Sequence, residues 1–359
     1  MQMLVKDIVK ACNGVLLCGD PETVITSVET DSRLIEPGAL FVPIIGQKTD
    51  AHQYIQQTFD KGAVAALTQE HTSMEDSAHC WIYVEQTQDA LQQIATVYRN
   101  QFQVPVVGVT GSVGKTSTRE MIALALSAEK NVMQTKGNSN SQIGLPLTMF
   151  QFEKEHTAAV IERGSSECGE MERLVHIAQP NYAVVTNIGI AHIEQLKTRE
   201  HIMHEKLKIA DAFDEYSIMF LNGDDEMLAS ICETTTLPVV YYGTQPWCTY
   251  RAEDIQTDGM KTTFTVHTPT YTSKVTLPVL GIHNVLNALS AIAVAQTMRL
   301  NLDKVVEKLN EYQPPEMRQT VYHIDDITVI DDSYNASPDS VKSGIDVLCS
   351  LPNQGKKIA

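Results

Sequence analysis

The chain has 359 residues, the composition of an ordinary globular protein and a formal net charge of −17 at pH 7. This length exceeds what one hydrophobic core usually organises, so two or three domains are expected. The acidic balance argues against a nucleic-acid-binding protein, because phosphate backbones are bound by cationic surfaces.

The sequence also carries signals about the compartment. No apolar run reaches the roughly 18 residues that a transmembrane helix needs, and the first residues lack the pattern of a signal peptide. The seven cysteines are scattered without a C-x-x-C pair, which is typical of reduced thiols rather than of disulfides or a zinc site. We therefore expect a cytoplasmic protein without a transmembrane segment. We also expect it to act as a monomer.

Residues 1–103 are predicted to form a small α/β domain. Short apolar runs at 40–45, 63–67 and 81–84 have the composition of strands. Residues 89–100 have the pattern of a closing helix.

Residues 104–314 are predicted to form a second domain in which apolar strands alternate with helices. This alternation indicates a doubly wound, largely parallel sheet. Alternating Thr, Phe and Val residues at 251–277 indicate an antiparallel extension, and 281–298 is predicted to be an Ala-rich helix. The predicted parallel strands lie at 106–109, 158–161, 182–186, 217–221 and 239–242.

Residues 315–359 are predicted to begin a third domain after the break at Gln313-Pro-Pro315. A strand is expected from Val321 to Ile330, followed by a loop and a helix. Too few residues follow for a complete α/β domain, so we expect this C-terminal domain to be incomplete. The predicted fold class is α/β, with a small N-terminal α/β domain, a central P-loop ATPase domain and the start of a C-terminal α/β domain.

A phosphate-binding loop is predicted between the strand at 106–109 and the helix that follows. Its glycines allow backbone N–H groups to face an anion. Lys115 supplies a positive charge for the β- and γ-phosphates, and the Thr116 hydroxyl is a ligand for Mg²⁺. The spacing is a shortened form of the usual motif, so a chance Gly-Lys-Thr turn is the alternative. The loop residues expected to bind ATP are Gly111, Ser112, Gly114, Lys115, Thr116 and Ser117.

Two further polar residues follow predicted strands. Glu162 ends the strand at 158–161, and His192 follows the strand at 182–186. Parallel strands present their carboxyl ends at one edge of the sheet, where such folds bind ligands. Glu162 and His192 are therefore predicted to join the phosphate loop around a hard cation. The alternatives are a solvated Glu at a strand end and a structural His.

Several segments spanning nearly the whole chain resemble the Mur ligases, ATP-dependent enzymes that extend the peptide of the bacterial wall precursor. The segment beginning at Asp331 is the most specific, because it separates the branch that adds a D-alanyl dipeptide from siblings that add single amino acids. The segments that carry the resemblance are Thr30-Asp-Ser-Arg33, Asp50-Ala-His52, Thr110 to Thr118, Gly137-Asn-Ser-Asn140, Glu162, Asn187-Ile-Gly189, Lys206, Gly281-Ile-His-Asn284 and Asp331-Asp-Ser-Tyr-Asn-Ala336.

This resemblance implies a ligase that adds D-Ala-D-Ala to UDP-N-acetylmuramoyl-tripeptide in peptidoglycan synthesis, with ATP and Mg²⁺ as cofactors. The tripeptide carboxylate would be activated as an acyl phosphate. A sibling Mur-type ligase and a divergent nucleotide-binding paralogue without ligase activity are the alternatives. The acceptor could carry lysine or diaminopimelate.

The resemblance also implies roles for individual residues. Lys206 matches a lysine that family members carbamylate with CO₂, and we expect Lys208, His204 and Arg199 to lower its pKa while Glu205 opposes them. The implied catalytic residues are Lys115, His192 and Lys206. The implied metal ligands are Thr116, Glu162, His192 and carbamylated Lys206. The implied ATP contacts beyond the loop are Asn284, Asn287, Arg318 and Asp332. The implied acceptor contacts are Ser32, Arg33, Asp50, His52, Asn138 and Asn140.

Overall fold

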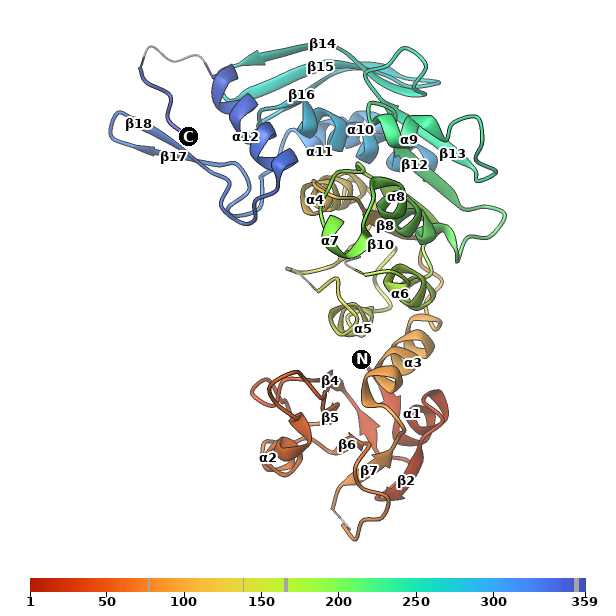
Figure 1. The fold of residues 1–359 in the computed structure, drawn as a ribbon. Coiled ribbons are helices and arrows are strands. Elements are labelled where there is room, and N and C mark those ends of the chain that lie inside the picture. The colour runs from red at the N-terminus through yellow and green to blue at the C-terminus, as the bar shows by residue number, and fades with distance from the viewer. Residues whose placement is uncertain (77, 138, 165–166, 352–354) are drawn as a thin grey trace. The chain divides into compact units, whose positions relative to one another are not determined.

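The computed structural model describes residues 1–359 except 77, 138, 165–166 and 352–354 (Figure 1). The chain divides into two compact units. The first contains Met1–Gln103, Thr135–Glu155 and His176–Ala178. The second contains Val104–Gln134, His156–Val175 and Gln179–Ala359. None of the helices within the described ranges is long and apolar enough to cross a membrane.

The first unit is built on a five-stranded sheet with the strand order β2-β7-β6-β5-β4. Strands β4 to β7 are parallel, and β2 is antiparallel at one edge. Its strands are β1 (Met3–Leu4), β2 (Val15–Cys18), β3 (Val24–Ile25), β4 (Ser27–Glu29), β5 (Ala39–Phe41), β6 (Ala65–Thr68) and β7 (Cys80–Tyr83). Its helices are α1 (Val5–Ala11), η1 (Ala51–Tyr54), α2 (Ile55–Asp60), α3 (Thr87–Arg99) and α5 (Gly144–Met149).

The core of this unit follows from the pleat of its sheet. Alternate residues of β5 turn Ala39 and Phe41 to one face, where they pack with Phe59 of α2 and Trp81 of β7. The strand expected at 40–45 is shorter than predicted and ends at Phe41. Pro43 explains the difference, because it has no N–H to donate to a neighbouring strand.

The second unit is built on a nine-stranded sheet with the order β16-β15-β14-β13-β12-β11-β8-β10-β9 (Figure 1). The strands from β9 to β14 are parallel, and β15 and β16 extend the sheet antiparallel. The predicted parallel sheet and its predicted antiparallel extension at 251–277 are both confirmed. The sheet strands are β8 (Val106–Thr110), β9 (Val132–Gln134), β10 (Ala158–Glu162), β11 (Tyr182–Val185), β12 (Ile218–Asn222), β13 (Val239–Gly243), β14 (Tyr250–Asp258), β15 (Lys261–His267) and β16 (Thr272–Leu277).

Helices cover the parallel part of the sheet because its strands are apolar on both faces. Helix α10 is apolar nearly all round and is buried against α4 and the strands (Figure 1). The helices are α4 (Lys115–Leu126), α6 (Glu170–Ala178), whose last residues belong to the first unit, α7 (Ile193–Leu196), α8 (Arg199–Leu207), η2 (Lys208–Ala210), α9 (Glu226–Ser230), α10 (Ile282–Thr297), α11 (Leu302–Leu309) and α12 (Pro338–Ser350).

One predicted element is wrong. The strand expected from Val321 to Ile330 is an antiparallel hairpin of β17 (Thr320–Ile324) and β18 (Ile327–Asp331). The chain turns at Asp325, whose φ of 51° lies in the left-handed region. Aspartate is among the few residues that tolerate this region, so an Asp-Asp turn divides the apolar run.

Candidate nucleotide-binding active site

The phosphate loop lies at the carboxyl end of β8, between β10 and β11. Gly114 adopts a left-handed conformation with φ of 80° and caps α4. Gly111 has no room for a side chain, because a Cβ there would overlap the Thr186 Oγ1. Both glycines of the motif are therefore required by the backbone, and the first N–H groups of α4, which lack partners within the helix, face outward from its N-terminus.

The loop is fixed by the segment that follows β11. The Ser112 N–H donates to the Asn187 carbonyl at 3.1 Å, and the Val113 N–H donates to Asn187 Oδ1 at 3.0 Å. The Gly189 N–H donates to Ser112 Oγ at 2.9 Å. These bonds fix the shape of the loop, so it forms a preorganised site for an anion.

Lys115 is turned back onto the loop. Its Nζ donates to the carbonyls of Gly111 and Ser112 at 2.9 and 3.1 Å. Burial lowers the pKa of Lys115, the carboxylate of Glu162 opposes this shift, and the charge of Arg318 adds to it. The structure thus brings the loop lysine within electrostatic reach of two other predicted site residues.

Glu162 is buried at the end of β10, beside Val109 of β8. Its Oε2 accepts a hydrogen bond from Arg119 Nη1 at 3.1 Å, and both side chains are 3% exposed. Thr116, in the first turn of α4, is also buried. The carboxylate and the hydroxyl are oxygen donors of the kind that hard cations prefer.

Lys206 lies on α8 and is 1% exposed. Burial and the charge of Lys115 lower its pKa to about 7, while Glu205 and Glu170 oppose this shift. The predicted opposition by Glu205 is confirmed. The predicted lowering by Lys208, His204 and Arg199 is wrong in its cause, because burial and a lysine 91 positions away in sequence supply it.

The acidic neighbours of Lys206 are themselves engaged. Glu205 accepts hydrogen bonds from the N–H groups of Gly169 and Met171, at 3.1 and 3.0 Å. Lys208 Nζ lies 3.4 Å from Glu205 and 3.5 Å from Glu172. Lys208 therefore pairs with Glu205, one of the two acids that raise the pKa of Lys206, and is not among the charges that lower it.

His192 precedes α7 in a left-handed conformation with φ of 64° and is exposed. Partial desolvation and the charges of Lys206 and Lys115 lower its pKa, while Glu170 opposes them. At neutral pH the imidazole is therefore largely unprotonated, which is the form that binds metals.

A cavity of about 420 Å³ opens next to the loop within the second unit. Asn287 Oδ1 accepts from Thr118 Oγ1 at 2.8 Å, so α10 is tied to α4 at this wall. The Arg318 guanidinium stacks over the Tyr334 ring at 4.2 Å. The structure brings together these predicted site residues at the cavity: Gly114, Ser117, Asn284, Asn287, Arg318 and Asp332.

The predicted acceptor residues lie in the first unit, except that Asn138 falls outside the described residues. Arg33 is exposed and pairs with Asp31, holding the pKa of that carboxyl at about 2. The Ser32 carbonyl accepts from Lys61 Nζ at 2.7 Å. Asn140 is partly buried.

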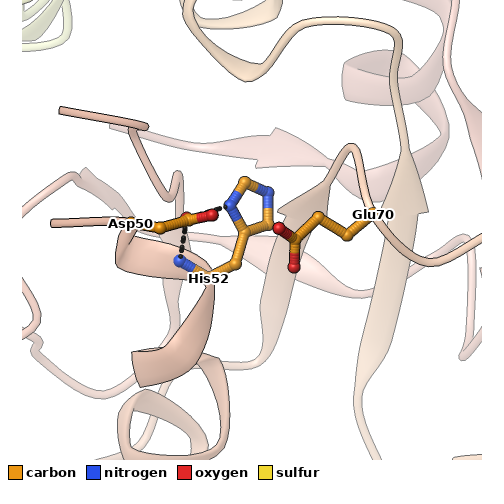
Figure 2. Close-up of side chains that lie close together, drawn as sticks. All are labelled: Asp50, His52 and Glu70. Carbon is orange, nitrogen blue, oxygen red and sulfur yellow. Dashed lines mark hydrogen bonds and ion pairs between the residues drawn. The ribbon is translucent and has the colours of Figure 1, made fainter. Parts of the chain in front are cut away.

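Asp50 and His52 form a cluster with Glu70 (Figure 2). Asp50 Oδ1 lies 2.7 Å from His52 Nδ1 and accepts from the His52 N–H at 2.9 Å. The Gln69 N–H donates to His52 Nε2 at 3.3 Å. Both ring nitrogens of His52 are thus engaged within the unit, so the imidazole anchors this loop and is a poor metal ligand.

Comparison with known proteins identifies the family. Residues 109–295 match the Mur ligase middle domain, and residues 24–105 match the Mur ligase family catalytic domain. The UDP-N-acetylmuramoyl-tripeptide–D-alanyl-D-alanine ligase of Bacillus subtilis is 36% identical over 358 residues, which cover 99% of this chain and 77% of that protein. The chain belongs to the Mur ligase family.

Solved Mur ligases have the same fold. MurF from Acinetobacter baumannii superimposes with a TM-score of 0.91 at 30% identity, covering 98% of this chain and 77% of that one. MurF from Thermotoga maritima in complex with ADP gives a TM-score of 0.83 at 28% identity, covering 91% and 75%. The α/β fold class and the resemblance inferred from sequence are therefore confirmed.

Some residues of this Mur ligase site were not found from the sequence. In the sequence, Arg119 lies in the helix predicted after the phosphate loop and Thr186 ends the strand predicted at 182–186, and neither position indicates a role in the site. Their roles depend on Glu162 and Gly111, which are distant in sequence. His283 lines the cavity, and its Nε2 lies 3.1 Å from Gln319 Oε1. It belongs to the Gly281-Ile-His-Asn284 segment, but the resemblance implied no ATP contact for it.

Proposed function

We propose that this chain is an ATP-dependent amide ligase that joins D-Ala-D-Ala to UDP-N-acetylmuramoyl-tripeptide in peptidoglycan synthesis. The observation that carries the proposal is the convergence of a preorganised phosphate loop, buried Glu162 and Lys206 with a pKa of about 7 in one unit. The Bacillus subtilis relative, which is named for this reaction, supports the proposed pair of substrates.

The chemistry explains why such a ligase needs a phosphate site. A carboxylate does not form an amide with an amine at a useful rate, because its oxygen is a poor leaving group. Transfer of the γ-phosphoryl group of ATP to the acceptor carboxylate gives an acyl phosphate and ADP. The dipeptide amine then attacks the acyl carbon, the C–O bond breaks, and phosphate leaves. Positioning and charge neutralisation dominate both steps.

ATP would bind the second unit with its phosphates at the loop and its nucleoside in the cavity. Its phosphates would meet the N–H groups at the start of α4, and Lys115 Nζ would exchange its two loop carbonyls for the β- and γ-phosphates. The nucleoside would enter the cavity lined by Asn284, Asn287, Arg318 and Asp332. The ADP complex of the Thermotoga maritima protein supports a nucleotide site in this fold.

The donor set around the loop fits magnesium. The Thr116 hydroxyl and the Glu162 carboxylate are hard oxygen ligands, and His192 is neutral at physiological pH. When bound, the ion would neutralise charge on the phosphates. Arg119 would keep Glu162 oriented through their 3.1 Å ion pair.

Lys206 is proposed as a carbamate. The neutral amine attacks CO₂, an N–C bond forms, and one proton leaves, which converts a cation into an anion. A pKa of about 7 leaves roughly half of the amine neutral at pH 7. Lys115, which lowers the pKa of the amine, would stabilise the carbamate by the same charge. The carbamate would be a further oxygen ligand for magnesium, beside those of Thr116, Glu162 and His192.

The acceptor is proposed to bind the first unit through its uridine diphosphate. Arg33 would leave Asp31 for a phosphate, since a salt bridge at the surface is weak. Ser32, Asp50, Asn138 and Asn140 would complete this site, and His52 would hold Asp50 in place through their 2.7 Å contact. We propose residues 1–103 as the domain that binds the UDP-linked acceptor, residues 104–314 as the domain that binds ATP, and residues 315–359 as the beginning of the C-terminal ligase domain. A monomer acting in the cytoplasm remains part of the proposal.

Phosphate release tests the function. We expect release from ATP to require both UDP-N-acetylmuramoyl-tripeptide and D-Ala-D-Ala, with one phosphate per amide formed. Release supported by a single amino acid instead would assign the chain to a sibling ligase. Nucleotide binding without release under any of these conditions would identify a paralogue without ligase activity.

The carbamate has a separate test. Lys206→Ala should lose turnover, and short carboxylates such as formate or acetate should restore part of it, because they can supply the missing oxygen ligand. A Lys206→Ala variant that is active without them, or that no carboxylate restores, would contradict the carbamate.

A further inference from the structure

Helix α12 begins beside the phosphate loop. Asp339, in its first turn, lies against Gly189 so closely that a Cβ at position 189 would overlap Asp339 Oδ2. The same Cβ would lie 3.3 Å from Ser112 Cβ. Because the Gly189 N–H donates to Ser112 Oγ at 2.9 Å, Asp339, Gly189 and Ser112 form one continuous contact between α12 and the loop.

The surface under Asp339 is rigid. The Ile188 N–H donates to Asp225 Oδ2 at 2.8 Å, and the Ile188 carbonyl accepts from Arg199 Nη2 at 2.8 Å. Arg199 also attracts Asp339: its pKa is raised first by a hydrogen bond to Glu226 and further by the charge of Asp339. The carboxylate of Asp339 is exposed, and it lies against Gly189 with the cation of Arg199 nearby.

The other part of α12 forms a wall of the nucleotide cavity. Ser340, Ser343 and Val347 all line it. Val347 is 3% exposed, and its Cγ2 would lie 3.0 Å from a Cβ at Gly281, the residue before α10. Helix α12 therefore packs against two glycines, with Asp339 against Gly189 and Val347 against Gly281. The cavity lies next to this helix.

We propose that Asp339 and Gly189 are positioning residues that hold α12 as the wall of the nucleotide cavity and thereby slow the release of ADP and ATP. The proposal rests on the assignment of this cavity to ATP made above. Asp339 acts through α12, and its first-turn position also suits a carboxylate because the N-terminal end of a helix is positive. Gly189 acts by leaving space for the carboxylate.

Two substitutions break the same contact from opposite sides. Gly189 does not have a positive φ, so the backbone accepts alanine, and the added Cβ displaces the Asp339 carboxylate. Asp339→Ala removes that carboxylate directly. We expect each variant to raise the Kd for ADP about three- to tenfold, mainly through faster dissociation. The double variant should be no weaker than either single one, because the contact can be lost only once.

The measurement is ADP binding by calorimetry and by stopped-flow dissociation, with thermal unfolding of the nucleotide-free variants beside it. Asp346→Ala is the matched control, because Asp346 is an exposed acid on the same helix. It should leave the Kd unchanged, and the nucleotide-free melting temperatures of all variants should stay close to that of the unsubstituted chain. A purely structural role would lower those temperatures without changing ADP dissociation.

The outcomes separate this proposal from the assigned function. Unchanged ADP affinity in Gly189→Ala or Asp339→Ala would overturn the positioning role alone, as would additive losses in the double variant. Absence of ADP binding by the unsubstituted chain would overturn the ATP assignment and this proposal with it.

Discussion

Arg163 should destabilise the protein that contains it. It follows β10 and is fully buried, and its three guanidinium nitrogens have no hydrogen-bond partner within the part of the chain that the structure describes. Burial lowers the pKa of Arg163 to about 9, and among the described residues no carboxylate opposes the shift. A buried charge without compensation costs several kcal/mol.

Arg163→Met removes this charge while keeping an apolar stem of similar length. Replacing buried charged groups with apolar residues of similar volume can stabilise a protein by about 1–4 kcal/mol. For a cooperative unit of roughly 200 residues, a gain of about 2 kcal/mol raises the melting temperature by about 4–8 °C. We expect a rise of that order.

Calorimetric unfolding measures the effect, and Arg119→Met is the matched control. Arg119 is also a buried arginine, but it pairs with Glu162 at 3.1 Å. Its removal takes the guanidinium away from a buried carboxylate, which should cost about 3–5 kcal/mol. The two substitutions should therefore move the melting temperature in opposite directions. If Arg163→Met also lowered it, the guanidinium of Arg163 would have a compensating partner and the reasoning would be refuted.

Three further predictions concern the loop and Lys206. Lys115→Ala should abolish the thermal stabilisation by ADP while leaving the nucleotide-free protein folded, and a retained ADP shift would contradict the phosphate assignment. Gly111→Ala should destabilise by about 1–3 kcal/mol in denaturant unfolding, because its Cβ would overlap Thr186 Oγ1 at a φ of 149°. Adding Thr186→Ala should recover part of this loss, and strictly additive losses would argue against the overlap. The folded-state pKa of Lys206, about 7, lies below its ordinary 10.5, so the unfolded chain binds more protons between these values. Stability should then rise with pH across that window by up to about 1.4 kcal/mol per unit, and Lys206→Met should lose this slope in urea unfolding at pH 7, 8 and 9.

The fold was predictable where local sequence and tertiary structure agree. The run Val106–Thr110 is apolar on both faces, as a central parallel strand must be, and the alternation at 251–277 gave the antiparallel extension. The prediction failed at Asp325, where one backbone conformation turns an apolar run into a hairpin. Aspartate also occurs on the exposed faces of strands, so the pattern of apolar residues alone does not show that the chain turns at Asp325.

The site was predictable to the extent that its chemistry is contained in short motifs. Gly111, Gly114 and Lys115 lie within five consecutive residues, so the sequence alone predicts that they bind phosphate together. Arg119 pairs with Glu162 across 43 positions, and no local pattern distinguishes this arginine from a solvated one. Burial decides between the two, and burial is a property of the packed sheet and helices.

The lysine pair shows how far this dependence on packing extends. Lys115 begins α4 and Lys206 lies near the end of α8, 91 positions apart in sequence, yet the charge of Lys115 lowers the pKa of Lys206. A partly buried cation and a fully buried one in the same site repel each other unless an anion lies between them or one of them changes its charge. Bound phosphates would place negative charge next to Lys115, and the proposed carbamate would make Lys206 an anion. Both the triphosphate and the proposed carbamate would draw on the positive charge of Lys115, and they would repel each other. We therefore expect nucleotide binding to weaken CO₂ uptake by Lys206 unless a divalent cation neutralises the two anions.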